Sequence, residues 1–277
     1  MAVLAVQQIR RMRGGAQGHL MLGADGQLWV VKFQNNPQHS RVLANEMLAT
    51  RLAAAAGLTV PETAVVEVSQ WLIENTPELE VDLGPGLGRG RVPCAAGLQF
   101  GARYMGGLMP GQVLDYLVEE ELAEVRNVAE FAGMLCLDKW TANANGRQAV
   151  FVRKARERRY GAVFIDQGYC FHAGDWRFED APLRGVYPRN AVYAGVSGWR
   201  SFEPWLTRME TMDPAVAWRA AAEIPPEWYG GDLGDLEMLV ERLLARRGRI
   251  RELVEEFGRS GREPFPKWVG MGKRLVM

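Results

Sequence analysis

Two short stretches of the sequence place polar side chains that can bind a metal at the end of apolar runs. They are residues 137–148 (LDKWTANANGRQ) and residues 163–168 (VFIDQG). The second stretch is an apolar strand that ends on Asp166, and packing alone does not explain it, because a buried carboxylate without a partner is costly. A loop that supplies carboxylate and amide oxygens, followed by a strand that delivers one more carboxylate, is the layout required around a magnesium ion that bridges nucleotide phosphates.

A lysine and a glutamate farther upstream are candidates to complete such a site. Lys32 lies on the strand face that also carries Leu28 and Val30, so its ammonium group needs water or a charged partner. Glu46, in the next helix, is the candidate partner, and a glycine-rich turn before the strand offers backbone N–H groups to phosphates. The glycines of this turn are Gly14, Gly15 and Gly18. Each feature alone also fits an edge-strand lysine that reaches solvent and an exposed helix glutamate, but their order along the chain favours a phosphate site.

Hydrophobic spacing predicts the elements that must position these residues. Residues 27–33 alternate and predict a strand. Ser40 is the expected N-cap of a helix that runs to about Ala56 and is stopped by Gly57. Two further strands are expected, near residues 64–68 and 98–104. Between them, residues 77–93 are rich in Gly and Pro and are expected to form a loop.

From Gly111 onward the apolar spacing becomes helical, starting at Val113 and Leu114. Short strands are expected over residues 149–151 and 162–165, and a long helix over residues 233–257. The predicted fold class is therefore α+β. A small β-rich N-lobe over residues 1–105 is expected to precede a larger, mainly helical C-lobe over residues 106–277.

Composition excludes several classes of protein. The 33 Lys and Arg residues balance the 33 Asp and Glu residues, so no overall field recruits nucleic acid or an anionic membrane. The cysteines Cys94, Cys136 and Cys170 are odd in number and lack C-x-x-C spacing, which argues against a disulfide framework or a structural zinc site. No apolar run reaches membrane-spanning length, and the N-terminus lacks a signal-peptide pattern. A cytoplasmic protein is expected.

The ordered set of motifs resembles the HipA-like kinases, in the short bacterial branch of that family. The resemblance rests on residues 31–33 (VKF), the pair Asn45 and Glu46, residues 57–61 (GLTVP) and the two stretches named first. It implies a two-lobed, protein-kinase-like fold that holds ATP and Mg²⁺ in the cleft between its lobes. It also implies phosphotransfer to serine or threonine, in some relatives within toxin–antitoxin pairs.

The resemblance also implies roles for individual residues. Lys32 would hold the α- and β-phosphates, Glu46 would pair with it, and Asp166 would ligate magnesium. The stretch that contains Gly101 and Tyr104 would be the hinge that reads adenine through its backbone. The glycine turn (Gly14, Gly15 and Gly18) would cover the phosphates.

The chain departs from the family at the position of the catalytic aspartate, where Asn145 stands. An amide cannot accept the proton of a substrate hydroxyl as a carboxylate can. The usual metal-binding asparagine a few residues farther on is also missing, so Gln148 is the nearby oxygen donor to the metal. Arg147 could contact the γ-phosphate or pair with Asp166, and the sequence leaves both roles open.

Three interpretations of this departure remain open. Asp138 could serve as the base with Asn143 on the metal, because the two have the Asp-to-Asn spacing of the protein-kinase catalytic loop. Asn145 could be a natural substitution in a nucleotide binder with weak or altered catalysis. It could also be a deliberate inactivating change.

The leading hypothesis is an ATP- and Mg²⁺-dependent kinase of the HipA-like class that phosphorylates a hydroxyl, with a protein serine or threonine as the expected acceptor. The alternative is a catalytically weak or inactive nucleotide-binding pseudokinase that acts through a protein partner. The resemblance suggests an antitoxin-type partner. Neither a membrane nor direct nucleic-acid binding is expected.

Overall fold

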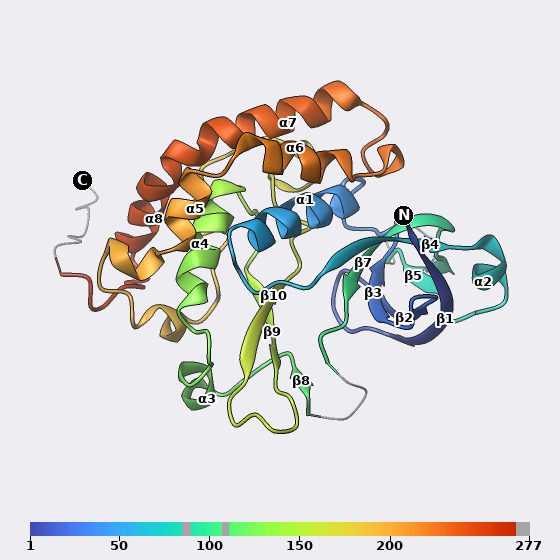
Figure 1. Ribbon diagram of the computed structural model, residues 1–277, viewed down its shortest axis with the longest axis horizontal. Helices are drawn as coiled ribbons and strands as arrows, with labels where there is room; N and C mark the ends of the chain where they lie inside the picture. The colour runs from blue at the N-terminus through green and yellow to red at the C-terminus, as the bar shows by residue number, and fades with distance from the viewer. Residues whose placement is uncertain (85–89, 107–110, 270–277) are drawn as a thin grey trace.

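The computed structural model of the chain describes residues 1–84, 90–106 and 111–269 (Figure 1). Its N-terminal part is a closed barrel with the strand order β1-β2-β3-β7-β4. The strands are β1 (Val3–Arg11), β2 (His19–Gly23), β3 (Leu28–Lys32), β4 (Thr63–Val68) and β7 (Gly97–Arg103). Neighbouring strands run antiparallel, except that β1 and β4 pair in parallel. The predicted strands over 27–33, 64–68 and 98–104 are confirmed within one or two residues.

Alternation along β3 sorts its side chains between the barrel interior and the outside. Trp29 and Val31 are buried in a cluster inside the barrel with Met21 and Phe33. Successive side chains of a strand point to opposite faces, so Lys32 points away from this interior. The barrel therefore presents the lysine on its outer face, toward the rest of the molecule.

Helix α1 (Val42–Ala55) follows β3, as predicted, but its start differs from the prediction. Ser40 is not the N-cap: Arg41 occupies that position, and no side chain caps the helix. The first turn is fixed by burial instead, since Val42 is 0% exposed. Helix α1 ends where predicted, because Gly57 has φ +83° and its N–H donates to the Ala54 carbonyl at 2.9 Å.

The segment predicted as a loop over residues 77–93 contains a small hairpin instead. Strands β5 (Glu80–Asp82) and β6 (Arg91–Pro93) pair antiparallel, after the short helix α2 (Gln70–Glu74). Residues 85–89 lie outside the described part of the chain. The prediction failed because strands of three residues are too short to show an alternating pattern.

A second sheet, with the order β10-β9-β8, lies below α1 in Figure 1. Its strands are β8 (Val113–Leu114), β9 (Gln148–Val152) and β10 (Gly161–Ile165). The two predicted strands on either side of the charged hairpin are confirmed as β9 and β10, which pair antiparallel. The helical prediction for Val113 and Leu114 is wrong, because these residues pair with Val152 and Phe151 of β9.

The C-terminal part is mainly helical. Its α-helices are α3 (Glu119–Ala123), α4 (Glu130–Trp140), α5 (Trp205–Glu210), α6 (Pro214–Ala222), α7 (Leu233–Arg246) and α8 (Ile250–Gly258). Short 3-10 turns cover Ala173–Asp175, Asn190–Tyr193, Trp199–Phe202, Pro226–Trp228 and Arg247–Arg249. The last of these interrupts the helix predicted over 233–257 and divides it into α7 and α8. Across the described ranges, no helix is both long enough and apolar enough to cross a membrane.

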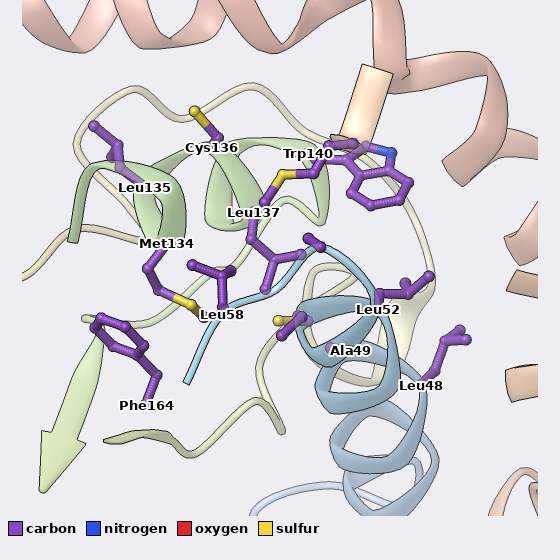
Figure 2. Packing of buried hydrophobic residues seen from close by; sticks show 14 of the residues in the cluster. Leu48, Ala49, Leu52, Leu58, Met134, Leu135, Cys136, Leu137, Trp140 and Phe164 are labelled. Carbon is purple, nitrogen blue, oxygen red and sulfur yellow. The ribbon is translucent and has the colours of Figure 1, made fainter. Parts of the chain in front are cut away.

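Helix α1 packs into the core of the helical part rather than resting on the barrel alone. Figure 2 shows Leu48 and Leu52 of α1 in one buried cluster with Leu137 and Trp140 of α4 and with Phe164 of β10. All five side chains are 0% exposed. The helix that carries Glu46 is thus fixed against the same core as the strand that ends at Asp166.

Candidate active site

Side chains from three separate elements meet at one ammonium group. Lys32 Nζ, at the end of β3, donates to Glu46 Oε1 of α1 at 2.5 Å. The same Nζ donates to Asp166 Oδ1, directly after β10, at 2.8 Å. The three side chains are only 10%, 3% and 11% exposed, respectively. The structure therefore brings together the residues on which the kinase hypothesis most depends.

Burial and charge act in opposite directions on these groups. Burial would lower the pKa of the Lys32 ammonium, but the carboxylates of Glu46 and Asp166 outweigh it and raise that pKa. Burial would likewise raise the pKa of Asp166, but Lys32, with a contribution from Arg147, holds it below its usual value. For Glu46, the more deeply buried acid, burial outweighs Lys32 and the pKa is raised. Asp166 is thus the more firmly ionised carboxylate, as a metal ligand must be.

Backbone conformation directs the Asp166 side chain into this site. Asp166 has φ +64°, a left-handed conformation that Asp tolerates better than most residues, and it turns the chain at the end of β10. Two residues later, a Cβ on Gly168 would lie 2.6 Å from Val42 Cγ2 and 3.2 Å from Glu46 Oε1. Glycine is therefore required there, and the Gly168 N–H donates to Glu46 Oε1 at 2.9 Å.

A cavity of about 360 Å³ lies beside Lys32, Glu46 and Asp166. Most residues predicted to bind the cofactor line it: Gly14, Gly15, Gly18, Lys32, Glu46 and Tyr104. Val30 and Ala102 from the barrel, and Val163 and Ile165 from β10, add apolar walls. A cleft of this volume, with apolar walls and a few convergent charged groups, suits a small ligand with a flat ring and an anionic tail. We call this cavity the interlobe cleft.

Gly101 does not line the interlobe cleft. A Cβ at this position would lie 2.4 Å from Val66 Cγ2 and 3.3 Å from Trp29 Cε3, inside the barrel. Its neighbour Ala102 lines the cleft instead. The sequence identified the correct strand but could not tell which of its faces meets the cleft.

Asp138, Asn143 and Arg147 form a buried network with one another. The Arg147 guanidinium binds both oxygens of Asp138: Nη2 donates to Oδ1, and Nε donates to Oδ2 at 2.9 Å. Asn143 Nδ2 also donates to Asp138 Oδ1, at 2.8 Å. The Arg147 and Asp138 side chains are each 1% exposed. Both Asp138 oxygens are therefore occupied by donors, which leaves this carboxylate poorly placed to accept a substrate proton.

Arg147 also links the catalytic-type loop to the strand that ends at Asp166. Its Nη1 donates to the Ile165 carbonyl at 2.8 Å and to Gln167 Oε1. Four hydrogen bonds thus hold the guanidinium in place. The sequence left two roles open for Arg147, an ion pair with Asp166 and a contact with the γ-phosphate. In the structure its guanidinium pairs with Asp138 instead, and each of its nitrogens already donates a hydrogen bond within the protein.

Asn145 and Gln148 are less buried than Asn143 and Arg147 of the same loop. Asn145 is half-buried; its backbone N–H donates to Asn143 Oδ1 at 3.0 Å, and its Oδ1 accepts from the Gly146 N–H at 2.8 Å. Gln148 is exposed, lines the interlobe cleft and donates through Nε2 to Asp166 Oδ2 at 2.7 Å. Asn143 and Asp138 line a separate hollow of about 440 Å³.

The donor set fits magnesium bound chiefly by phosphates and water. Mg²⁺ typically takes one or two protein oxygens and keeps several waters. Asp166 offers a carboxylate at the cleft surface, and rotation of the adjacent Gln148 amide would present its oxygen. Within the described ranges, no group of three or more His, Cys, Asp or Glu residues converges. Asn143 uses both ends of its amide within the loop. Asp166 and Gln148, which bond each other at the cleft surface, are therefore the predicted ligands best placed to reach a metal.

One acidic residue of the cleft was not predicted from the sequence. Asp115 follows β8 directly and lines the same cavity as Lys32. The expected helix over Val113 and Leu114 hid it, because on a helix those two residues and Asp115 would face different directions.

Comparison with solved structures shows a protein-kinase-like fold. The proinflammatory kinase CtkA of Helicobacter pylori superposes with a TM-score of 0.52 at 12% identity, over 92% of this chain and 99% of CtkA. The hydra Fam20 structure with sugar gives 0.50 at 10% identity, over 93% and 85% of the two chains. A HipA–HipB–operator DNA complex of Shewanella oneidensis gives 0.44 at 13% identity, over 92% of this chain and 67% of HipA. The superpositions on CtkA and Fam20 confirm the predicted α+β, two-lobed kinase-like fold.

Comparison with family models identifies the family that the motifs resemble. Residues 5–107 match the model described as HipA-like kinase. The matched range contains nearly all of the barrel, the glycine turn, Lys32 and α1 with Glu46. The predicted resemblance to HipA-like kinases is thus confirmed, and together with the fold it supports a kinase-like phosphotransferase. Comparison with curated proteins gave no match.

Proposed function

We propose that the protein binds ATP with Mg²⁺ in the interlobe cleft and transfers the γ-phosphoryl group to a hydroxyl, with a protein serine or threonine as the first candidate acceptor. The observation that carries this proposal is the position of Lys32 Nζ, 2.5 Å from Glu46 and 2.8 Å from Asp166. A kinase requires a lysine held by a helix glutamate beside a metal-binding aspartate. The two lobes would divide near residue 105.

Each residue has a defined task in this proposal. Lys32 binds the α- and β-phosphates, and Glu46 holds its ammonium in place. Asp166 and Gln148 hold Mg²⁺, which when bound neutralises charge on the phosphate oxygens. The glycine turn covers the phosphates with backbone N–H groups. Because phosphoryl transfer depends mainly on positioning and charge stabilisation, this set supports catalysis without a strong base.

In the reaction, the bond from the γ-phosphorus to the β–γ bridging oxygen breaks, and a bond to the acceptor oxygen forms. The acceptor proton must then leave. Asn145 cannot take it, and both oxygens of Asp138 are occupied. The proton therefore passes to water or to the transferred phosphoryl group, which makes turnover slow.

Asn145 and Asp138 also favour a second candidate function, a pseudokinase that binds nucleotide and acts through a protein partner. The loop presents an amide where a base belongs, while Lys32, Glu46 and Asp166 remain assembled. The antitoxin-type partner suggested by the family resemblance and the cytoplasmic location suggested by the cysteine content belong to this proposal.

Restoring a carboxylate distinguishes the two candidates. With Mg²⁺-ATP and a generic protein acceptor, we expect Asn145→Asp to raise the transfer rate by at least about tenfold, because a positioned general base contributes roughly 10²–10⁴-fold. The matched control is Asn190→Asp, in a 3-10 turn of the helical part, which should leave the rate unchanged. If neither the wild type nor Asn145→Asp transfers phosphate, yet Mg²⁺-nucleotide raises the melting temperature of both, the pseudokinase is correct.

A further inference from the structure

The residue before Glu46 on α1 holds the chain that follows Asp166. Asn45 is 0% exposed. The two N–H groups of its Nδ2 face three backbone carbonyls and share them: Gly168 at 2.9 Å, Cys170 at 2.9 Å and Ala173 at 2.7 Å. Its Oδ1 accepts from Trp176 Nε1 at 2.7 Å. One side chain therefore organises residues 168–176, which we call the Asn45-bound segment.

Glu46 holds the same segment at its first residue. The Gly168 N–H donates to Glu46 Oε1 at 2.9 Å, and the Gly168 carbonyl accepts from Asn45. Consecutive residues of α1 thus bind both polar groups of one peptide residue, two positions after Asp166. Any rotation of α1 that moved Glu46 away from Lys32 would also break these bonds. Lys32, Glu46 and Asp166 are coupled through Gly168.

The backbone of the segment adopts a conformation that needs such support. Phe171, His172 and Ala173 have φ of +59°, +57° and +57°, and Trp176 has +51°. Left-handed conformations at non-glycine residues cost free energy and persist only where the surroundings determine them. Asn45 stabilises this conformation, because it binds the carbonyl of Cys170, just before the left-handed residues, and the carbonyl of Ala173, the last of the three in a row.

Contacts at the far end of the segment anchor it to α1 a second time. The Arg41 guanidinium, at the start of α1, lies 4.2 Å from the centroid of the Trp176 ring. Arg41 also pairs with Asp235 of α7 at 2.5 Å. The Trp176 ring is therefore held between its hydrogen bond to Asn45 and the stacked guanidinium.

The Asn45-bound segment and the glycine turn contain no serine or threonine that a kinase could phosphorylate. The sequence has no serine or threonine between Asp166 and Ser197, and none from Arg10 to Gln27 around the glycine turn. Phosphorylation of a serine or threonine therefore cannot order either segment. The order seen in residues 168–176 must come from contacts such as those of Asn45.

We propose that Asn45 is a positioning residue of the phosphotransfer site, which fixes the Asp166 loop to α1 and keeps Lys32, Glu46 and Asp166 assembled without a phosphorylation step. The proposal rests on the proposed function. Asn45 does not contact nucleotide; it acts through Gly168 and the segment that follows. Loss of the Asn45 side chain should weaken the binding of Mg²⁺ at Asp166 more than it weakens the binding of nucleotide.

The test compares Asn45→Ala with Asn190→Ala, which also loses a satisfied asparagine amide but far from the cleft, where Asn190 bonds Arg262. For Asn45→Ala we expect kcat to fall by at least about tenfold, since small misplacements of reacting groups are costly. The Mg²⁺ concentration for half-maximal rate should rise, and excess Mg²⁺ should restore part of kcat. The KM for ATP should change less than about threefold, and Asn190→Ala should match the wild type.

Trp176→Phe is the second variant, because it keeps an aromatic ring at this position and removes the Nε1 donor to Asn45. It should shift the Mg²⁺ dependence in the same direction by a smaller factor. Wild-type Mg²⁺ dependence and wild-type rate per folded molecule in both variants would overturn the proposal, whatever happens to the melting temperature.

Hydrogen exchange separates failure of this proposal from failure of the proposed function. A wild-type protein without turnover or Mg²⁺-nucleotide binding would count against the function. The positioning role would still be tested by the amides of residues 168–176, which should lose protection in Asn45→Ala and not in Asn190→Ala. Unchanged protection in Asn45→Ala overturns the positioning role.

Discussion

Replacing Lys32 with alanine should lower the rate of ATP turnover by at least about 100-fold, the scale of losing one group that stabilises charge in a transition state. The substitution removes the ammonium that lies between Glu46 and Asp166. Two largely buried carboxylates would then face each other without compensation, and a triphosphate entering the cleft would meet negative charge. ADP release at saturating Mg²⁺-ATP, normalised to folded protein, measures the effect.

The matched control for this substitution is Lys154→Ala. Lys154 is an exposed lysine in the hairpin between β9 and β10, away from the interlobe cleft. Its replacement should leave turnover within about twofold of the wild type, since isolated surface substitutions have small effects. A Lys32→Ala protein that is folded and turns over ATP at the wild-type rate would exclude the proposed site.

Replacing Arg147 with methionine should lower the free energy of unfolding by about 3–5 kcal/mol, the usual result of removing one partner from a buried ion pair. The Asp138 carboxylate, 1% exposed, would keep Asn143 as its hydrogen-bond donor and lose both bonds from the guanidinium. The Ile165 carbonyl and Gln167 would lose a donor as well. Urea denaturation at neutral pH measures the change.

Two further variants show whether this loss comes from an unpaired buried charge. Arg159→Met removes an exposed arginine that pairs with Glu124 at 3.0 Å, where the side chains are 63% and 64% exposed. It should cost less than about 1 kcal/mol. Combining Arg147→Met with Asp138→Asn removes both buried charges and should recover part of the loss. If Arg147→Met is as stable as the wild type, the Asp138–Arg147 pair does not stabilise the loop as described.

Local pattern was enough to predict the elements that carry the central residues. The alternation over residues 27–33 predicted β3, and the apolar runs before Lys32 and Asp166 predicted that both side chains would leave a strand toward polar partners. A lysine on an apolar strand and a strand-terminal aspartate each need a counter-charge, and the resemblance to HipA-like kinases implied that the two share one site. The structure shows that they meet at 2.8 Å.

Features that depend on tertiary contact could not be predicted in this way. Asp138 and Arg147 are nine residues apart across an irregular loop, so no periodicity announces their pairing. The start of α1 is fixed by burial of its first turn rather than by a Ser40 cap. Gly101 and Ala102 occupy opposite faces of β7, and only the packing of Val66 shows which face is inside the barrel. The contacts of Asn45 join α1 to a segment more than a hundred residues away.

A crystal structure of the protein with Mg²⁺ and a non-hydrolysable ATP analogue tests the central claim most directly. We expect the triphosphate between the glycine turn and Lys32, with the metal on Asp166 and on the amide oxygen of Gln148. A nucleotide bound outside the interlobe cleft, or bound there with neither Lys32 nor Asp166 contacting phosphate or metal, would contradict it.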